Sequence, residues 1–181
     1  MPRTTAQDVI LEILRAGDGE WTGKTKLFKA FYFAHLYYAE AQPGLLTHWP
    51  IARMPQGPGI HMSRELFAGL VQDGLMLVEP VHEGPYPEYR YRLTDKGRDA
   101  ARPPEDVRAA VREAVSFCLP RTAVELSQIT HERSRSWIES RDGELLDIYI
   151  DIIPDDEYEK RRAEMEQTDK QLQTALGGPP A

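Results

Sequence analysis

The stretch KTKLFKAFYFAHLYYAE at Lys24–Glu40 constrains the fold of this chain most strongly. Between Leu27 and Ala39 its only strongly polar side chains are Lys29 and His35. A helix that is apolar on nearly every face is buried among other elements, whereas a surface helix has one polar face. The stretch has no glycine or proline, and it is too short to cross a bilayer, which takes roughly 20 apolar residues. We therefore predict that it is the buried central helix of a soluble domain.

Length and charge predict one domain followed by a charged appendage. The chain has 181 residues, of which 41% are hydrophobic, enough for a sizeable core. Residues 1–102 hold 12 of the 22 basic and 12 of the 29 acidic residues. The whole net charge of −7 therefore lies in residues 103–181, with 10 basic and 17 acidic residues. An acidic second half disfavours wrapping around nucleic acid and suits a basic protein partner.

Cysteine and histidine usage predicts no metal and no cofactor. The single cysteine, Cys118, excludes an intramolecular disulfide and a thiolate metal cluster. The five histidines lack the spacing of a zinc motif. The N-terminus lacks a secretory signal pattern, and no apolar run is long enough to span a membrane. These features favour a cytoplasmic protein that makes no membrane contact.

The first 74 residues are predicted to be helical on both sides of a long loop. Thr4 or Thr5 caps a first helix, and Trp21 lies in the linker before the central helix. The loop contains a short strand around Trp49 and Ile51. The proline and glycine content of Met54–Gly59 predicts an irregular segment. The apolar spacing of Ile60–Gly74 predicts a helix.

A β-hairpin is predicted near residues 75–93. Tyr89, Tyr91 and Leu93 alternate with Arg90 and Arg92, which is the period of a half-buried strand. A Gly-Pro turn joins this strand to the preceding one, and TDKG then opens a short helix. Helix, hairpin and L-T-x-K-G together give the outline of a winged helix.

The second half is predicted to be mostly helical. Pro103 starts one helix, and Thr122 with Glu125 forms the capping box of the next. Leu145–Ile153 alternates apolar and polar residues, so we predict an extended segment. The predicted fold class is mainly α (α+β), with a helical domain over residues 1–153 and a charged helix and tail over 154–181.

Four motifs follow one another along the chain. They are T-K-L-F-K-A-F-Y-F-A at Thr25–Ala34, a Q-G-P loop within Pro55–Pro58, Y-R-L-T-D-K-G at Tyr91–Gly97, and L-S-x-x-T-H-x-x-x-x-x-W at Leu126–Trp137. In this order they resemble the Panacea antitoxin domain, the family of SocA-like and phage-associated proteins. The resemblance covers residues 5–152. It departs from the family pattern at Gln56, where the family usually has an aromatic residue, and at Phe28 and Phe31, near positions that are usually polar or aliphatic.

The resemblance implies a non-enzymatic antitoxin that binds and neutralises a toxin encoded beside it, with one branch delivering the toxin to a protease. The positions that match family motifs are Lys26, Tyr32, Gly57, Pro58, Thr130, His131 and Trp137. Their simplest role is structural. His131 and Trp137 would join the second half to the central helix, and Gly57-Pro58 would shape the loop.

We therefore predict an antitoxin-like protein that neutralises a cognate toxin by protein–protein contact. The candidate contact residues are a lysine cluster and an acidic segment: Lys24, Lys26, Lys29, Asp147 and Asp151. Complementary charges at an interface mainly set encounter rate and orientation. The sequence leaves open whether the chain also forms a homodimer.

Two alternatives differ in class. A winged-helix transcription regulator would read DNA through His61 and Arg64 and contact phosphates through Arg90 and Arg92. The region has no net positive charge, and phosphate contacts supply most non-specific affinity for DNA. An enzyme of unknown class would need a pocket that joins His131 to carboxylates of perturbed pKa.

Overall fold

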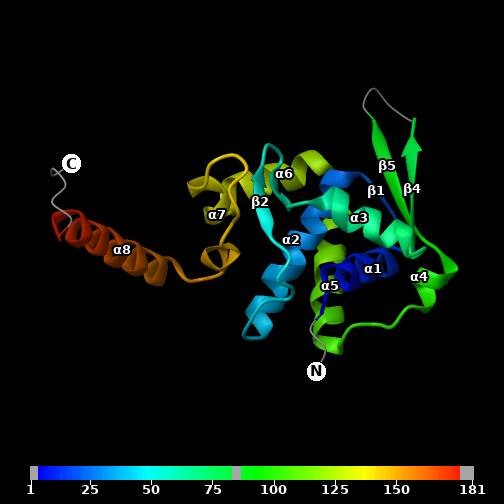
Figure 1. Ribbon diagram of the computed structural model, residues 1–181, viewed down its shortest axis with the longest axis horizontal. Coiled ribbons are helices and arrows are strands. Elements are labelled where there is room, and N and C mark those ends of the chain that lie inside the picture. Colours follow the sequence, from blue (N-terminus) through cyan, green and yellow to red (C-terminus); the bar gives the residue numbers. More distant parts are fainter. Residues whose placement is uncertain (1–3, 83–86, 176–181) are drawn as a thin grey trace. The chain divides into compact units, whose positions relative to one another are not determined.

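A computed structural model describes residues 4–82 and 87–175 of the chain (Figure 1). Helices dominate and the strands form two small sheets, so the predicted mainly α, α+β class is confirmed. The chain divides into two compact units, Met1–Asp151 and Ile152–Ala181. None of the described helices is long and apolar enough to cross a membrane.

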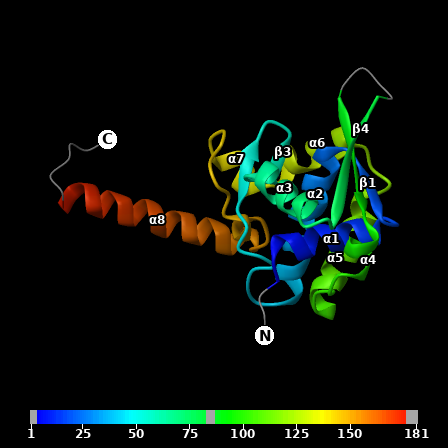
Figure 2. The ribbon, with the colours of Figure 1, turned by 45° about the vertical axis from the view of Figure 1, so that its right-hand side comes forward.

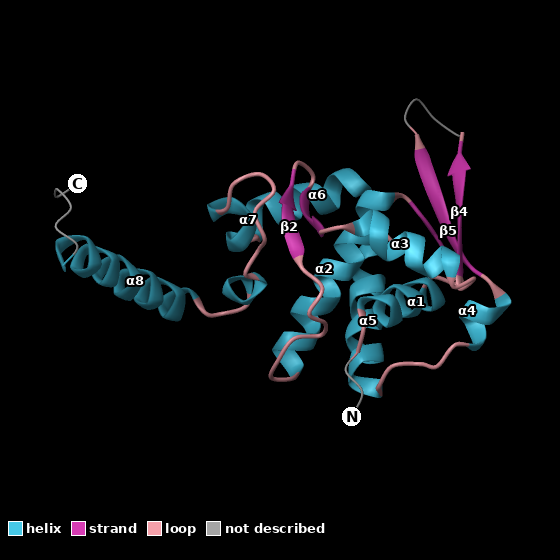
Figure 3. Cartoon of the chain, viewed as in Figure 1, coloured by secondary structure: helices cyan, strands magenta, loops and turns pink. Residues whose placement is uncertain are grey.

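Apart from a hairpin inserted between α2 and α3, the N-terminal part of the first unit has the element order of a winged helix. Its helices and outer strands are α1 (Ala6–Ala16), β1 (Glu20–Thr22), α2 (Lys24–Ala41), α3 (Ser63–Gln72), β4 (Met76–Val81) and β5 (Glu88–Leu93). The strands form an antiparallel sheet in the order β1-β5-β4. Figure 3 draws β4 and β5 of this sheet in magenta. Tyr91 of β5 pairs with Trp21 on one side and Val78 on the other.

The predicted hairpin near residues 75–93 is present, while its expected Gly-Pro turn lies outside the described residues. The linker prediction for Trp21 is wrong, because this residue lies in β1 and is buried against the core. A strand of three residues is too short for its alternation to be visible in the sequence.

α2 is the central helix, as predicted, and α5 (Glu105–Cys118) packs along both α2 and α1 (Figure 2). The residues of α2 from Leu27 to Tyr32 are all buried, Lys29 included. His35 is buried as well, and its Nδ1–H donates to the carbonyl of Phe31 (2.8 Å). Burial lowers the pKa of His35 to about 4, so this imidazole is neutral at pH 7.

A second hairpin lies between α2 and α3 and corrects the prediction of an irregular Met54–Gly59. β2 (Ile51–Met54) pairs with β3 (Gly57–Ile60), and Pro55 and Gln56 form the two-residue turn. β3 is buried along its whole length, so the signal of its Pro and Gly residues is overridden by packing. Because Ile60 belongs to β3, α3 begins at Ser63, three residues later than predicted.

The remaining elements of the first unit are α4 (Asp95–Asp99), α5, α6 (Ala123–Arg133), α7 (Arg135–Glu139) and the 3-10 helix η1 (Ile148–Asp151). The capping box predicted for Thr122 and Glu125 opens α6. The extended prediction for Leu145–Ile153 is wrong. Leu145 makes one isolated bridge to β2, and the chain then turns into η1, where Asp151 is hydrogen-bonded to side chains of other elements.

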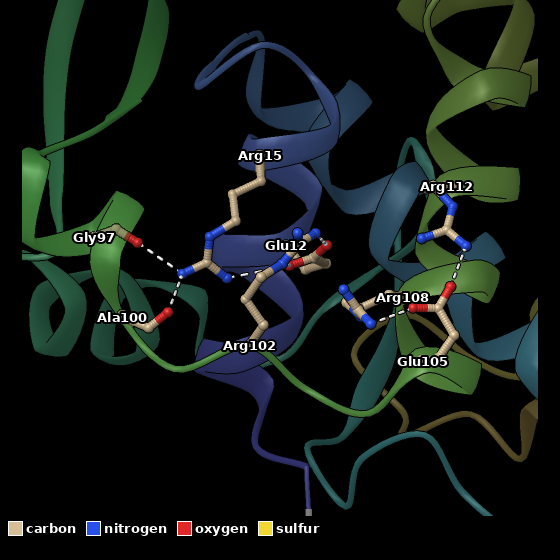
Figure 4. Close-up of polar contacts among 8 residues, drawn as sticks. All are labelled: Glu12, Arg15, Gly97, Ala100, Arg102, Glu105, Arg108 and Arg112. Atoms are coloured by element: carbon tan, nitrogen blue, oxygen red, sulfur yellow. Dashed lines mark hydrogen bonds and ion pairs between the residues drawn. The ribbon is translucent and has the colours of Figure 1, made fainter.

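A buried carboxylate fastens the connection between α4 and α5 to α1 (Figure 4). Glu12 of α1 is 1% exposed and accepts hydrogen bonds from Arg15 (3.1 Å) and from Arg102. Arg15 also donates to the carbonyls of Gly97 (2.7 Å) and Ala100 (2.9 Å). The cost of burying the carboxylate is thus offset by two guanidinium partners.

The second unit consists mainly of α8 (Asp155–Ala175), which has no buried residue. Arg161 forms an ion pair with Glu157 (2.5 Å), and Arg162 forms another with Glu166 (3.4 Å), both at i,i+4 spacing. Exposed pairs of this kind stabilise a helix by only a few tenths of a kcal/mol.

Replacing Glu12 by glutamine is expected to lower the free energy of unfolding by about 2–3 kcal/mol, because the neutral amide leaves Arg15 and Arg102 without their shared counter-charge. Urea unfolding followed by circular dichroism measures the change. The control is Glu105→Gln, which removes an exposed carboxylate that also pairs with two arginines, Arg108 and Arg112, and should leave stability nearly unchanged. Equal effects of the two substitutions would show that the buried Glu12 carboxylate does not fasten the α4–α5 connection to α1.

Candidate functional site

The β2–β3 turn is held by side chains from α2, α6 and α7. The Lys29 amine of α2 donates to the carbonyls of Gln56 (2.5 Å) and Pro58 (3.3 Å). Gly57 has a φ of +98°, and the space where its Cβ would lie is filled by the Lys29 amine and the Thr130 hydroxyl. A residue with a side chain would therefore be both strained and sterically blocked at position 57.

An aromatic stack closes the other side of this turn. The His131 ring of α6 stacks on the Trp137 ring of α7, with centroids 4.1 Å apart and planes 14° apart. The Arg53 guanidinium lies 4.1 Å from the Trp137 ring centroid and donates from Nε to the Trp137 carbonyl (2.8 Å). The indole N–H of Trp137 in turn donates to the carbonyl of Met54 (2.9 Å). The stack therefore joins α6 and α7 to β2.

His131 is neutral at pH 7 in this setting. Burial lowers its pKa, and the nearby Lys29 charge adds to this, whereas a hydrogen bond with the backbone of Pro55 acts in the opposite direction. His131 and Trp137 thus pack on the β2–β3 turn, and Lys29 makes the link to the central helix that the sequence assigned to these two residues. Arg53 and Lys29 are structural members of this cluster that the sequence did not indicate.

The three lysines predicted as one binding surface do not share a surface. Lys29 is 1% exposed, so its assignment as a contact residue is wrong. A lysine is normally exposed because its amine needs hydrogen-bond partners. Here two backbone carbonyls accept those hydrogen bonds, so the amine can be buried. The Lys24 ammonium lies 5.2 Å from the Phe28 ring centroid, and Lys26 donates to the carbonyl of Leu119 (3.0 Å). Lys24 is exposed and Lys26 is partly exposed, so both stay candidates.

The two predicted acidic contact residues also differ. The Asp151 carboxylate accepts hydrogen bonds from the Tyr32 hydroxyl (2.7 Å), the Ser134 hydroxyl (3.0 Å), and the hydroxyl and N–H of Ser136 (both 2.7 Å). Burial and the Asp151 charge raise the pKa of Tyr32. Asp151 is thus engaged within the fold, which corrects its assignment as a contact residue, whereas Asp147 is exposed.

The residues of the DNA-binding alternative lie around α3 and on the wing. Arg64 and Arg92 are exposed, and Arg92 forms an ion pair with Glu79 (2.8 Å). His61 and Arg90 are partly buried. The charge that these residues offer to phosphates is therefore reduced by burial and by pairing.

The described residues contain no group of three or more His, Cys, Asp and Glu side chains that could hold a metal ion. Cys118 is buried at the end of α5, and burial raises its pKa to about 12. Its thiol is therefore protonated at pH 7 and packs as a small apolar group.

No family model, no curated protein and no solved structure matches this chain. The likeness to the Panacea antitoxin domain therefore stands on the four sequence motifs alone.

Gly57→Ala is expected to lower the free energy of unfolding by about 3 kcal/mol or more, since the new methyl group needs a strained φ and displaces Lys29 and Thr130. The matched control is Gly44→Ala, at another positive φ with nothing within 4 Å of the added Cβ. It should cost about 1–2 kcal/mol, from backbone strain alone. Urea unfolding of both variants gives the difference, and similar values would show that the turn is not tightly held.

Lys29 also predicts a pH dependence of stability. Burial lowers the pKa of its amine to about 7 from 10.5, so between these values the unfolded chain binds more protons than the folded chain. Stability should therefore rise from pH 7 to pH 9 by about 2 kcal/mol through this group. Urea unfolding at both pH values measures the rise.

The comparison variants are Lys29→Met, which should abolish this rise, and Lys26→Met, which should keep it. Lys26 also donates to a carbonyl, but it lies partly exposed. A rise that survives in Lys29→Met would assign it to other groups.

Proposed function

We propose that this chain is an antitoxin-like protein that binds a cognate protein toxin, encoded nearby, and neutralises it by covering its active surface. One observation carries this proposal. Of the seven positions matched to the Panacea antitoxin motifs, five surround the β2–β3 turn. A sixth lies on α2, about one helical turn beyond Lys29. The five are Gly57, Pro58, Thr130, His131 and Trp137, and the sixth is Tyr32.

The five residues around the turn are separated by up to 80 positions in the sequence, from 57 to 137. Chance matches to a motif would be scattered over the fold, whereas residues of one structural signature would meet. Their meeting around one turn supports reading the motifs as a unit, and with them the class of protein that they resemble.

The setting of His131 supports binding rather than catalysis. Its ring is stacked on Trp137, and the charged groups that shift its pKa are the cations Lys29 and Arg53. An enzyme that used this histidine as a general base would gain from a carboxylate to orient it and to stabilise its charged form. The observed neighbours favour the neutral imidazole instead.

Winged-helix architecture is the observation that favours the second candidate, a DNA-binding regulator. The two candidates differ in their dependence on salt. Phosphate contacts would make affinity for DNA fall steeply as salt is raised. If duplex DNA does not bind even at low salt, the regulator function fails and the antitoxin function is unaffected.

The proposal predicts that the product of an adjacent gene stops growth when it is expressed alone, and that co-expression of this chain restores growth. The two proteins should then co-purify on a tag carried by either one. Asp147→Lys, which reverses an exposed charge outside the buried networks, should weaken binding several-fold at low salt and less at high salt. A harmless neighbour that does not co-purify would contradict the antitoxin function.

A further inference from the structure

A groove on the first unit lies beside the hydrogen bond between Tyr32 and Asp151. It has a volume of about 300 Å³ and lies between α2, the end of α5 and α6. α2 lines it from Tyr32 to Glu40, α5 contributes Phe117, and α6 contributes Ile129 and Arg133. The α2 side runs over nine residues, from 32 to 40, which corresponds to about 12 Å along a helix axis.

Apolar side chains form the walls of the groove. Phe33 and Phe117 meet edge to face, with ring centroids 4.7 Å apart. Leu36 and Ile129 complete the wall and are only partly buried. Aromatic and aliphatic side chains around a hollow are typical of the centre of a protein interface, where an anchor side chain of the partner is received.

Polar groups lie at the ends of the groove. At one end the Tyr32 hydroxyl is fixed by Asp151 (2.7 Å). At the other end Glu40 is exposed and lies near Tyr37, whose pKa is raised by burial and by the Glu40 charge. Within the described part of the chain, neither Glu40 nor Arg133 forms an ion pair with any other residue. Glu40 is therefore available to a cation from outside.

We propose that this groove receives a short segment of the partner protein, with an apolar anchor side chain between Phe33, Phe117 and Ile129 and a neighbouring Lys or Arg at Glu40. This inference rests on the proposed function and adds where the partner docks and by which chemistry. A length of about 12 Å fits about four residues of extended chain. The basic side chain complements the exposed carboxylate of Glu40.

The test uses the full-length chain and the neighbouring gene product as the probe. Ile129→Arg places a charge in the apolar wall and is expected to weaken binding at least tenfold in titration calorimetry. The matched control is Val124→Arg on the same helix, at a position that is 75% exposed and outside the groove, which should change affinity less than twofold. Glu40→Lys should weaken binding several-fold, with the loss shrinking at high salt.

A second measurement does not depend on how well Ile129→Arg folds. A photo-reactive phenylalanine analogue in place of Leu36 should cross-link to the neighbouring protein, whereas the same analogue in place of Val124 should not. If wild type binds the neighbour while Ile129→Arg binds equally well, or while position 36 fails to cross-link, the groove is not the docking site and the antitoxin function stands.

Two further outcomes are decisive. If wild type does not bind the neighbour at all, the proposed function fails, and the docking proposal falls with it. If native mass spectrometry of the purified chain shows a small molecule that Ile129→Arg releases, the groove is a small-ligand site and the docking proposal is overturned.

Discussion

A lysine amine in the middle of a buried helix is the interaction on which the arrangement of this domain depends. Lys29 lies among apolar neighbours on α2, where a polar group without a hydrogen-bond partner costs several kcal/mol. The carbonyls of Gln56 and Pro58 satisfy it, which ties the β2–β3 turn to the central helix. Once the turn is placed, the carbonyl of Met54 and the side chain of Arg53 hold Trp137, and so α7 is fixed to the β2–β3 hairpin.

Charged side chains that serve inside the fold also explain why the sequence wrongly predicted Lys29 and Asp151 as contact residues. Glu12, Lys29 and Asp151 all look like surface residues in the sequence, since charged side chains are seldom buried. Each one instead joins elements that are far apart in the chain, through arginines, through backbone carbonyls or through hydroxyl groups. The charges left for a partner are therefore fewer than the composition suggests, and they lie at exposed positions such as Asp147 and Glu40.

Local signals predicted the helices well, and non-local contacts account for most of the errors. The period of apolar residues located α2, and side-chain caps located the starts of α1 and α6 at Thr5 and Thr122. β1 is short, and it exists because the distant strand β5 pairs with it. β3 pairs with the neighbouring β2, but its Pro and Gly residues conceal the strand in the sequence. Leu145–Ile153 alternates like a strand, yet hydrogen bonds to Asp151 draw it into a 3-10 turn. The groove combines residues from three helices, so no single stretch of sequence indicated it.

The five motif residues around the β2–β3 turn and the groove have Thr130 in common. Residues whose role is structural can therefore also support binding. Thr130 touches Gly57 on one side and lines the groove on the other, and the hydroxyl of Tyr32 is fixed by Asp151 at the groove's end. A groove held by such contacts needs little ordering when a partner enters, and binding then loses less conformational entropy. Residues that never meet the partner would thus raise affinity by keeping the walls in place. Under the proposed function, the buried cluster supplies rigidity and the groove supplies the contact, so neutralising a toxin requires no chemistry from this chain.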